Sequence, residues 1–272
     1  MKYALISSLF ILLSFLSGYL LIRFLTRKKT MSHARSFILS FLAGLSIMMA
    51  GSMAYLLPYQ KAEPDAREYL TSTDELTLYD GRLERTEYYS LENRKSDTAL
   101  IFYPGAKVDP VAYSQLCRKI ADSGIDVYLI RMPFHMALFN MNGAEDIIDH
   151  KAYSHVYLAG HSLGGTMAAN YTANHSQNVD GLILLASYST RQIKEVPVLS
   201  IYGDKDGCLE MNVYNKNKVN FPKDTTEVII PGGNHAQFGQ YGHQKGDNEA
   251  AISCEEQIDE TVSAILSFIK NH

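Results

Sequence analysis

A serine flanked by glycines is the residue of this chain best suited to covalent chemistry. The segment Gly160-His-Ser-Leu-Gly164 follows a short apolar run and precedes a run that is compatible with a helix. In a strand, turn and helix of this kind, the turn exposes the serine hydroxyl, and the glycines leave room for neighbouring backbone. The pattern therefore predicts that Ser162 is a nucleophile. The alternative is a glycine-rich turn whose serine only caps the following helix.

A serine nucleophile needs a base, and His235 is the candidate. The segment Pro231-Gly-Gly-Asn-His235 directly follows a predicted strand. We expect His235 to accept the serine proton and to return it to the leaving group. His175 and His243 are alternatives, although neither directly follows a strand. His161, which precedes the serine, is assigned packing or hydrogen bonding and no catalytic role.

The acid should come from the loop after the preceding strand. The segment Gly203-Asp-Lys-Asp-Gly207 follows a predicted strand at 198–202 and holds two carboxylates. We expect Asp206 to hold the histidine ring in the required tautomer and to stabilise the imidazolium, because it stands far enough into the loop to turn toward the ring. Asp204 is the alternative acid, although its position at the strand end suits a residue that brackets the turn.

Two backbone N–H groups are candidates for an oxyanion hole. Leu163 follows the serine and begins the predicted helix, so its N–H has no partner within that helix. The second donor should be Ala106, in the segment Tyr103-Pro-Gly-Ala-Lys107 after the first parallel strand, where Gly105 permits the turn. The alternative for this segment is a plain strand-to-helix turn with Asp109 capping the next helix.

The elements that must position these residues alternate in type. Near-continuous apolar strands with helices between them are typical of a parallel sheet covered on both faces. The predicted strands are 99–103, 127–131, 156–159, 182–186, 198–202 and 227–230. The predicted helices are 110–123, 144–150, 163–176, 211–220 and 255–270. Active groups lie beyond the carboxyl ends of the strands in such a sheet, and Ser162, Asp206 and His235 all follow predicted strands.

A hairpin is expected ahead of these strands. Residues 75–79 and 82–90 flank Asp80-Gly81, which is a two-residue turn signal. We therefore expect a linker and an N-terminal β-hairpin over 60–97, followed by a catalytic α/β domain over 98–272.

Two charge-free apolar runs precede the domain, at about 3–22 and 36–59. Each is long enough to cross a hydrocarbon core of about 30 Å as a helix, so residues 1–59 predict a transmembrane helical hairpin. The loop at 23–35 carries five of the six basic residues of this part. The positive-inside rule assigns that loop to the cytoplasm and the catalytic domain to the extracytoplasmic side of the cell membrane. The alternative is that the first run is a cleaved signal peptide.

Charge and cysteine content exclude several classes of function. The chain has 25 Lys and Arg against 29 Asp and Glu, and every acidic residue lies after residue 59. This acidic part argues against nucleic-acid binding, because it would repel phosphates. Cys117, Cys208 and Cys254 are too few and too scattered for a disulfide framework or a zinc site. We therefore expect no metal and no cofactor.

The motifs together resemble those of the α/β-hydrolases. From about Ala99 to Lys270 the chain is similar, more narrowly, to the bacterial group often called alpha/beta hydrolase fold-5. The matching stretches are Tyr103-Pro-Gly-Ala-Lys-Val-Asp-Pro, Gly160-His-Ser-Leu-Gly-Gly and Gly232-Gly-Asn-His-Ala-Gln-Phe-Gly. The chain order Ser, Asp, His is also that of the α/β-hydrolases. The resemblance implies an α/β-hydrolase fold and serine hydrolase chemistry at these three residues, and it names no substrate.

We accordingly expect a serine hydrolase of the esterase or thioesterase type. Its partners would be a small-molecule or lipid-like acyl ester and the lipid bilayer that its two helices cross. One alternative is an acyltransferase that uses the same acyl-enzyme, and another is a non-catalytic binding module on the same fold. Only residues 187–197 separate two of the strands, which leaves no room for a cap domain, so we expect an open site.

Two further segments are candidates for the pocket wall. Residues 132–141 are rich in Met and Phe and follow a strand end, so they either line an acyl-binding wall or pack as an ordinary connection. Residues 236–253 form a long loop punctuated by glycines directly after His235, which is a candidate lid.

Overall fold

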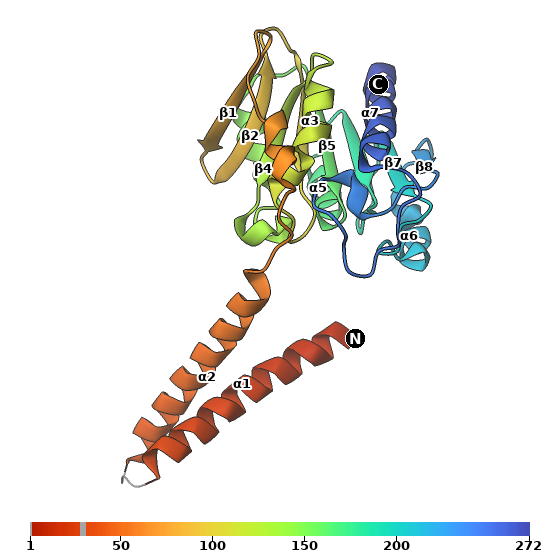
Figure 1. Cartoon of the computed structure of the whole chain (residues 1–272). Coiled ribbons are helices and arrows are strands. Elements are labelled where there is room, and N and C mark those ends of the chain that lie inside the picture. The colour runs from red at the N-terminus through yellow and green to blue at the C-terminus, as the bar shows by residue number, and fades with distance from the viewer. Residues whose placement is uncertain (1, 28–30) are drawn as a thin grey trace. The chain divides into compact units, whose positions relative to one another are not determined.

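The structure is a computed structural model that describes residues 2–27 and 31–272 (Figure 1). The chain divides into two compact units, Met1–Pro58 and Tyr59–His272. Every residue of the second unit is described. We describe each unit by itself.

Two apolar helices make up the first unit. They are α1 (Lys2–Thr26) and α2 (His33–Leu56). The helices meet at a pair of glycines, because a Cβ on Gly18 would lie only 2.4 Å from the backbone nitrogen of Gly44. The absence of side chains at these two positions lets the helix backbones pack closely.

The observed bounds correct the expected end of the second helix. We expected that helix to run to residue 59, but α2 ends at Leu56. Pro58 explains the end, because proline has no N–H with which to continue the helical hydrogen bonds. Tyr59 belongs to the second unit instead. The basic residues Lys28 and Lys29 of the expected connecting loop lie outside the described residues.

A single sheet forms the centre of the second unit, with strand order β1-β2-β4-β3-β5-β6-β7-β8. The strands are β1 (Leu76–Leu83), β2 (Thr86–Asn93), β3 (Thr98–Tyr103), β4 (Asp126–Arg131), β5 (His155–His161), β6 (Gly181–Leu185), β7 (Val198–Gly203) and β8 (Thr226–Ile230). Strands β3 to β8 are parallel to one another, whereas β2 runs antiparallel to both β1 and β4. The predicted parallel sheet is therefore confirmed.

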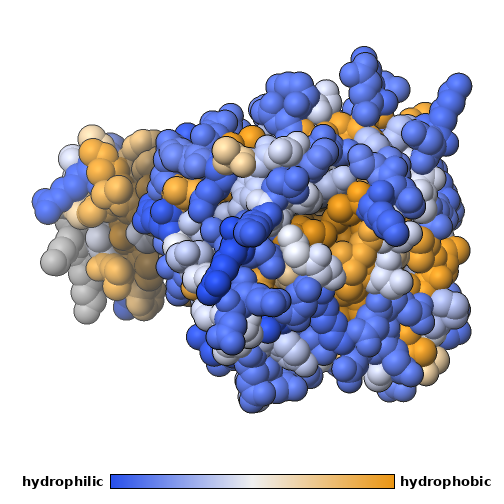
Figure 2. All heavy atoms as spheres, turned by 90° about the horizontal axis from the view of Figure 1, so that it is seen from above, coloured by the Kyte–Doolittle hydropathy of each residue, from blue (hydrophilic) through white to orange (hydrophobic). Residues whose placement is uncertain are grey.

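Helices cover both faces of the sheet, as alternating side chains along β3 make clear. Leu100 and Phe102 join a core cluster with α3 and α7, whereas Ile101 and Tyr103 join a second cluster with α4 and α5. The helices of this unit are α3 (Ser114–Ala121), α4 (Gly143–His150), α5 (Leu163–Asn174), α6 (Met211–Asn217) and α7 (Cys254–Asn271). On the face shown in Figure 2, hydrophilic side chains predominate over the centre of the view, and hydrophobic ones are also visible, among them a group to the right of the centre.

The predicted turn of the N-terminal hairpin is wrong. Asp80 and Gly81 lie inside β1, and the turn is made by Glu84 and Arg85, with Glu84 at a φ of 45°. Gly81 has a different role, because a Cβ there would lie 2.9 Å from the hydroxyl of Tyr88 on the paired strand. The glycine therefore accommodates an aromatic side chain that crosses the hairpin.

No helix interrupts residues 186–197, which join β6 to β7 within the fully described second unit. A cap domain inserted at this connection would need such helices. The expectation of an uncapped α/β fold is therefore confirmed.

The expected linker after residue 59 packs on the domain. We call residues 59–70 the strap. The N–H of Gln60 donates to the carbonyl of Lys107 at 2.7 Å, and the N–H of Asp109 donates to the carbonyl of Gln60 at 2.8 Å. Ala66, in the short helix of the strap, is fully buried. The strap is thus fixed beside the loop that follows β3.

Candidate active site

Ser162 lies in a strained turn between β5 and α5. Its φ of 52° and ψ of −122° are values that a side-chain-bearing residue rarely adopts, at a cost of about 1–3 kcal/mol. Backbone contacts hold the turn: its N–H donates to the carbonyl of Leu185 at 2.9 Å, and its carbonyl accepts from the hydroxyl of Ser187 at 2.7 Å. The turn therefore presents the serine side chain at the carboxyl edge of the sheet.

Two glycines make this turn possible. A Cβ on Gly164 would lie 2.2 Å from the carbonyl oxygen of Tyr103, and one on Gly160 would lie 2.6 Å from the backbone nitrogen of Gly165. Real Cβ atoms do not approach backbone atoms this closely, so a side chain at 164 would push α5 away from β3, and one at 160 would push α5 away from β5. The glycines on either side of the serine are needed for close backbone packing as well as for flexibility.

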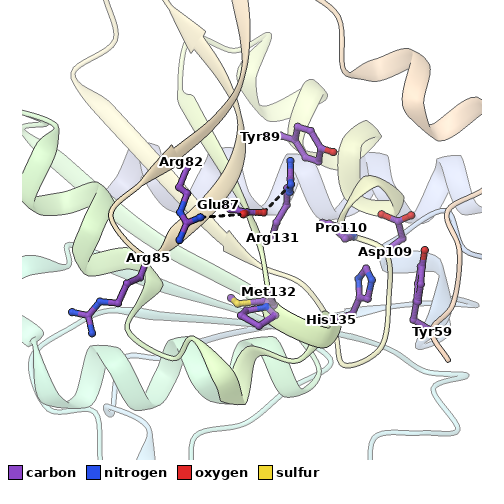
Figure 3. Close-up of a pocket in the computed structure, with 11 residues that line it drawn as sticks. Tyr59, Arg82, Arg85, Glu87, Tyr89, Asp109, Pro110, Arg131, Met132 and His135 are labelled. Carbon is purple, nitrogen blue, oxygen red and sulfur yellow. Dashed lines mark hydrogen bonds and ion pairs between the residues drawn. The ribbon is translucent and has the colours of Figure 1, made fainter. Parts of the chain in front are cut away.

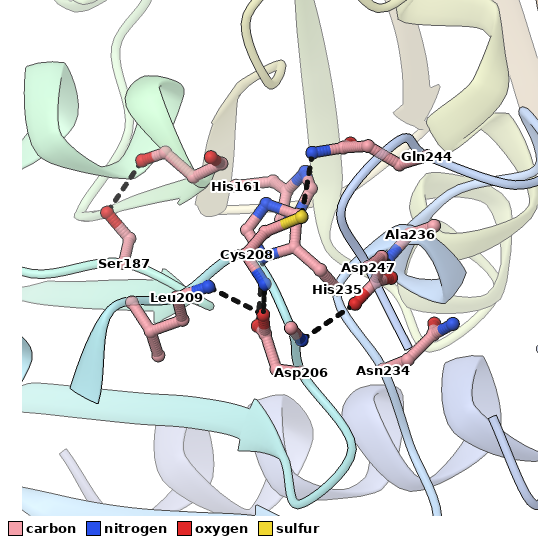
Figure 4. A network of polar contacts seen from close by, with 12 residues as sticks. His161, Ser187, Asp206, Cys208, Leu209, Asn234, His235, Ala236, Gln244 and Asp247 are labelled. Carbon is pink, nitrogen blue, oxygen red and sulfur yellow. Dashed lines mark hydrogen bonds and ion pairs between the residues drawn. The ribbon is translucent and has the colours of Figure 1, made fainter. Parts of the chain in front are cut away.

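His235 and Asp206 form a buried pair at the ends of β8 and β7 (Figure 4). His235 Nδ1 lies 2.9 Å from Asp206 Oδ2, and the two side chains are 3% and 2% exposed. The other carboxylate oxygen, Oδ1, accepts from the N–H groups of Cys208 and Leu209 at 2.8 and 2.7 Å. Because an ionised carboxylate can only accept, the proton of neutral His235 lies on Nδ1. The Nε2 lone pair is then available to accept a proton.

The alternative acid and bases lie elsewhere. Asp204 is exposed, and its Oδ1 accepts from the N–H of Gly232 at 2.8 Å, so it brackets the ends of β7 and β8. The Nδ1 of His175 contacts the carbonyl of Tyr171 at 3.0 Å, and His243 is exposed on the loop after β8. The carboxylate that contacts a histidine ring here is that of Asp206.

Ser162, Asp206 and His235 all follow the carboxyl ends of parallel strands. The hydroxyl of Ser162, however, makes no hydrogen bond with the His235–Asp206 pair. Within residues 2–27 and 31–272, no hydrogen bond of Ser162 Oγ is present. The neighbouring His161 ring lies 4.6 Å from the His235 ring, measured between centroids. Hydrogen bonds between a nucleophile and its base are often long before substrate binds. The missing bond between Ser162 and His235 therefore does not argue against a role for Ser162 as the nucleophile.

The N–H groups of Ala106 and Leu163 have no hydrogen-bond acceptor in the described part of the chain. Their neighbours in the loop after β3 are committed: the N–H of Gly105 donates to the hydroxyl of Tyr113 at 3.1 Å, and that of Lys107 donates to the carbonyl of His135 at 2.6 Å. Leu163 is the first residue of α5, where helical N–H groups lack internal partners. Both groups are therefore available to a developing oxyanion.

His161 and Tyr113 contact each other beside the serine turn, and the sequence does not predict this pair. The Tyr113 hydroxyl lies 2.8 Å from His161 Nδ1, so it joins the oxyanion loop to the serine turn. Burial, with the nearby charge of His235 as a second cause, holds the pKa of His161 well below its usual value. A neutral His161 does not compete with His235 for a proton. Only tertiary structure could pair residues 48 positions apart.

Asp247 joins the acid loop to the base loop. Its Oδ1 accepts from the N–H of Gly207 at 2.8 Å, and its Oδ2 accepts from the N–H of Ala236 at 2.9 Å. One carboxylate thus fixes the residue after Asp206 relative to the residue after His235. Asp247 is not predicted from the sequence, because nothing in the local pattern distinguishes it from other acidic loop residues.

The long loop after His235 is held against the domain. Phe238 and Tyr241 are buried, the N–H of Gln240 donates to the carbonyl of Ala112 at 2.7 Å, and the amide of Gln244 donates to Cys208 Sγ at 3.3 Å. These contacts hold the loop against the oxyanion side of the domain and against the loop that carries Asp206.

In the segment after β4, some side chains pack in the core and others are exposed, so each of the two interpretations fits part of it. Met132 and Ala137 are buried in the core, as the packing alternative expects. Phe134, Leu138 and Phe139 are exposed, so they remain available for contact with an apolar partner.

The cysteines do not offer a competing nucleophile. Burial raises the pKa of Cys208 to about 11 and that of Cys254 to about 12, with nearby carboxylates adding to each rise. Burial also raises the pKa of Cys117. All three thiols are therefore protonated at neutral pH and weakly nucleophilic.

Replacement of Asp247 by Asn should slow reaction of the serine. An amide can accept only one of the two N–H bonds and presents its NH2 group to the other, so the acid and base loops separate slightly. We expect labelling by a fluorophosphonate probe to slow by roughly 10- to 100-fold, as measured by time-resolved gel fluorescence. The control is Glu249→Gln, an exposed carboxylate on the same loop. Equal labelling rates for the two variants would contradict a positioning role.

His161 should make stability depend on pH. Its folded-state pKa is lowered, so the unfolded chain binds the proton more readily, and the free energy of unfolding decreases as pH falls below about 6.5. His161→Gln should show a smaller loss between about pH 7.5 and about pH 5.5 in urea unfolding. His135, whose pKa burial also lowers, is present in both proteins and cancels in the comparison. The same loss in both proteins would argue against this assignment.

Known proteins with a similar sequence profile or a similar structure have the same fold as this chain. The sequence profile of the alpha/beta hydrolase family matches residues 99–259. Among solved structures, a predicted CIB-like hydrolase from Thermoplasma acidophilum is 15% identical, with a TM-score of 0.56, over 72% of this chain and all of its own. Dienelactone hydrolase from Anabaena variabilis is 13% identical, with a TM-score of 0.54, over 71% of this chain and 98% of its own.

An epoxide hydrolase from Vigna radiata is 10% identical, with a TM-score of 0.57, over 74% of this chain and all of its own. These identities are low, so the likeness concerns the fold. No curated protein matches the chain. Because the family profile spans more than half of the sequence and the strand order agrees with it, the chain belongs to the α/β-hydrolase family.

Proposed function

We propose that this α/β-hydrolase is a serine hydrolase that cleaves a carboxylic ester or thioester and is anchored in a membrane by α1 and α2. The observation that carries the catalytic part is the buried contact of 2.9 Å between His235 Nδ1 and Asp206 Oδ2. It leaves Nε2 as the free base in a site where Ser162 occupies a strained, half-buried turn.

The proposed mechanism assigns each group one task. Nε2 of His235 takes the proton of Ser162 as Oγ attacks the acyl carbon. The N–H groups of Ala106 and Leu163 bind the resulting oxyanion, and Asp206 stabilises the imidazolium. The imidazolium then donates its proton to the leaving alcohol or thiol, which leaves an acyl-enzyme. Water, activated by the same histidine, attacks this ester and releases the carboxylic acid.

The length and surface of the two helices support the anchor. The described helices include apolar segments of 18 and 24 residues, Leu9–Thr26 and His33–Leu56, and each is long enough to cross a bilayer. Large apolar side chains such as Leu12, Phe24 and Phe37 are exposed along them, which water would disfavour. With the basic connection at 23–35 on the cytoplasmic side, the catalytic domain lies outside the cytoplasm.

Ser162→Ala should abolish labelling of the full-length protein by a fluorophosphonate probe. His235→Ala and Asp206→Asn should each lower turnover of a short-chain aryl ester by on the order of 1,000-fold, because the base or its orientation is lost. Asp204→Asn is the matched control, since an amide oxygen can still accept the bond from Gly232. Labelling that survives Ser162→Ala, or equal losses for the two aspartates, would refute the proposed triad.

The proposed topology has a separate test. Protease added to intact cells should remove the catalytic domain and leave a protected fragment of the two helices, as detected with tags at residue 30 and at the C-terminus. Lysed cells provide the control for intrinsic sensitivity to protease. Full protection of the C-terminal tag in intact cells would reverse the assigned orientation.

A further inference from the structure

An exposed apolar patch lies on the connection that follows β4. We define the apolar patch as Phe134, Leu138 and Phe139, which are 44%, 59% and 49% exposed. The rings of Phe134 and Phe139 meet edge to face, with centroids 5.6 Å apart, so the patch is continuous. Large apolar side chains that gather in contact with water mark a surface that meets another apolar phase.

The backbone is built to hold this patch outward. Phe134 and His135 both have a φ of 52°, which is unfavourable for bulky residues. The same segment places Met132 and Ala137 in the core. These two side chains pack the segment on the domain without the side chains of the patch. Packing of the domain therefore does not account for the outward direction of the patch.

The strap links the apolar patch to the end of α2. The ring of Tyr59 stacks on the ring of His135, with centroids 3.9 Å apart (Figure 3). Tyr59 is three residues beyond Leu56, the last residue of α2, so covalent geometry limits the distance between them to about 11 Å. This limit holds for every orientation of the two units. A helix that ends at a membrane surface therefore keeps Tyr59, and with it the His135 ring next to Phe134, within reach of that surface.

Cationic side chains lie beside the patch. Arg82 and Arg85 line one hollow together with Phe139 of the patch and with the acidic residues Glu145 and Asp146. They also line a hollow of about 470 Å³ with Tyr59 and His135 (Figure 3). Within the described chain, the guanidinium of Arg85 makes no ion pair. The ion pair of Arg82 with Glu87 is long and exposed, at 3.8 Å, and Arg82 Nε donates to the carbonyl of Glu84 at 3.1 Å. Positive charges next to exposed aromatic side chains suit an anionic headgroup region with its apolar boundary beneath.

We propose that the apolar patch, flanked by Arg82 and Arg85, docks on the surface of the lipid bilayer in which α1 and α2 are anchored. The inference rests on the proposed membrane anchor and is independent of the proposed triad. The bond of 2.6 Å from the N–H of Lys107 to the carbonyl of His135 joins the docked segment to the oxyanion loop. Docking therefore holds the catalytic site at the bilayer surface.

The absence of tryptophan from the sequence permits a direct test. Three single variants of the full-length protein each carry one reporter at an exposed apolar position: Phe139→Trp in the patch, Leu42→Trp on α2, and Tyr79→Trp on β1 as the matched reference. Each is reconstituted in vesicles of equal parts phosphatidylcholine and phosphatidylglycerol, with either plain or dibrominated acyl chains. Bromine quenches indole emission only at short range. Fluorophosphonate labelling of each variant reports the serine independently.

The proposal expects loss of emission in brominated vesicles for Leu42→Trp and Phe139→Trp, a blue shift for both, and no change for Tyr79→Trp. Quenching at Leu42→Trp alone would overturn docking of the patch and leave the anchor intact. Quenching at none of the three would overturn the anchor and the docking together. A protein that is quenched at the patch but not labelled would retain the docking surface and lose the serine hydrolase assignment.

Discussion

Close approach between the start of α5 and the end of β3 is the constraint on which the rest of the site depends. The carbonyl of Tyr103 occupies the space where a side chain at position 164 would lie. This contact leaves Ser162 with an unfavourable backbone conformation, and it brings the free N–H of Leu163 toward the loop that carries Ala106. The cost of about 1–3 kcal/mol at the serine is offset by the packing of a helix and a sheet that are both buried. The strained turn at Ser162 and the free N–H of Leu163 thus depend on one close contact between backbones.

The acid–base pair of the site, Asp206 and His235, lies on the loops that follow β7 and β8. Asp206 uses both of its oxygens, one for the histidine and one for two backbone N–H groups, so the buried carboxylate has several donors as compensation for lost water. Asp247 then ties the two loops together through backbone N–H groups. Gln257 on α7 secures the base loop from the other side, since its amide both donates to and accepts from the backbone of Asn234. The histidine and its loop are therefore held by groups on three other parts of the chain: the Asp206 loop, Asp247 and Gln257.

The oxyanion loop has a second dependence, on the strap. The loop after β3 is bonded to Gln60 on one side and to His135 on the other. The segment that leaves α2 in this way holds the loop after β3, although it precedes β3 by many residues along the chain. The strap that makes these hydrogen bonds is joined covalently to the end of α2.

Local pattern in the sequence was sufficient for much of this molecule. Apolar runs determined the strands from residue 98 onward, and glycines beside Ser162 identified the turn, because both depend on neighbours within a few residues. The hairpin turn was misplaced, since Gly81 is required by Tyr88 across the strand pair and not by a local turn. The roles of Tyr113, Asp247 and the strap were decided only by tertiary structure. Their partners lie tens of residues away along the chain, and a hydrogen bond formed at that separation leaves no periodic trace in the sequence.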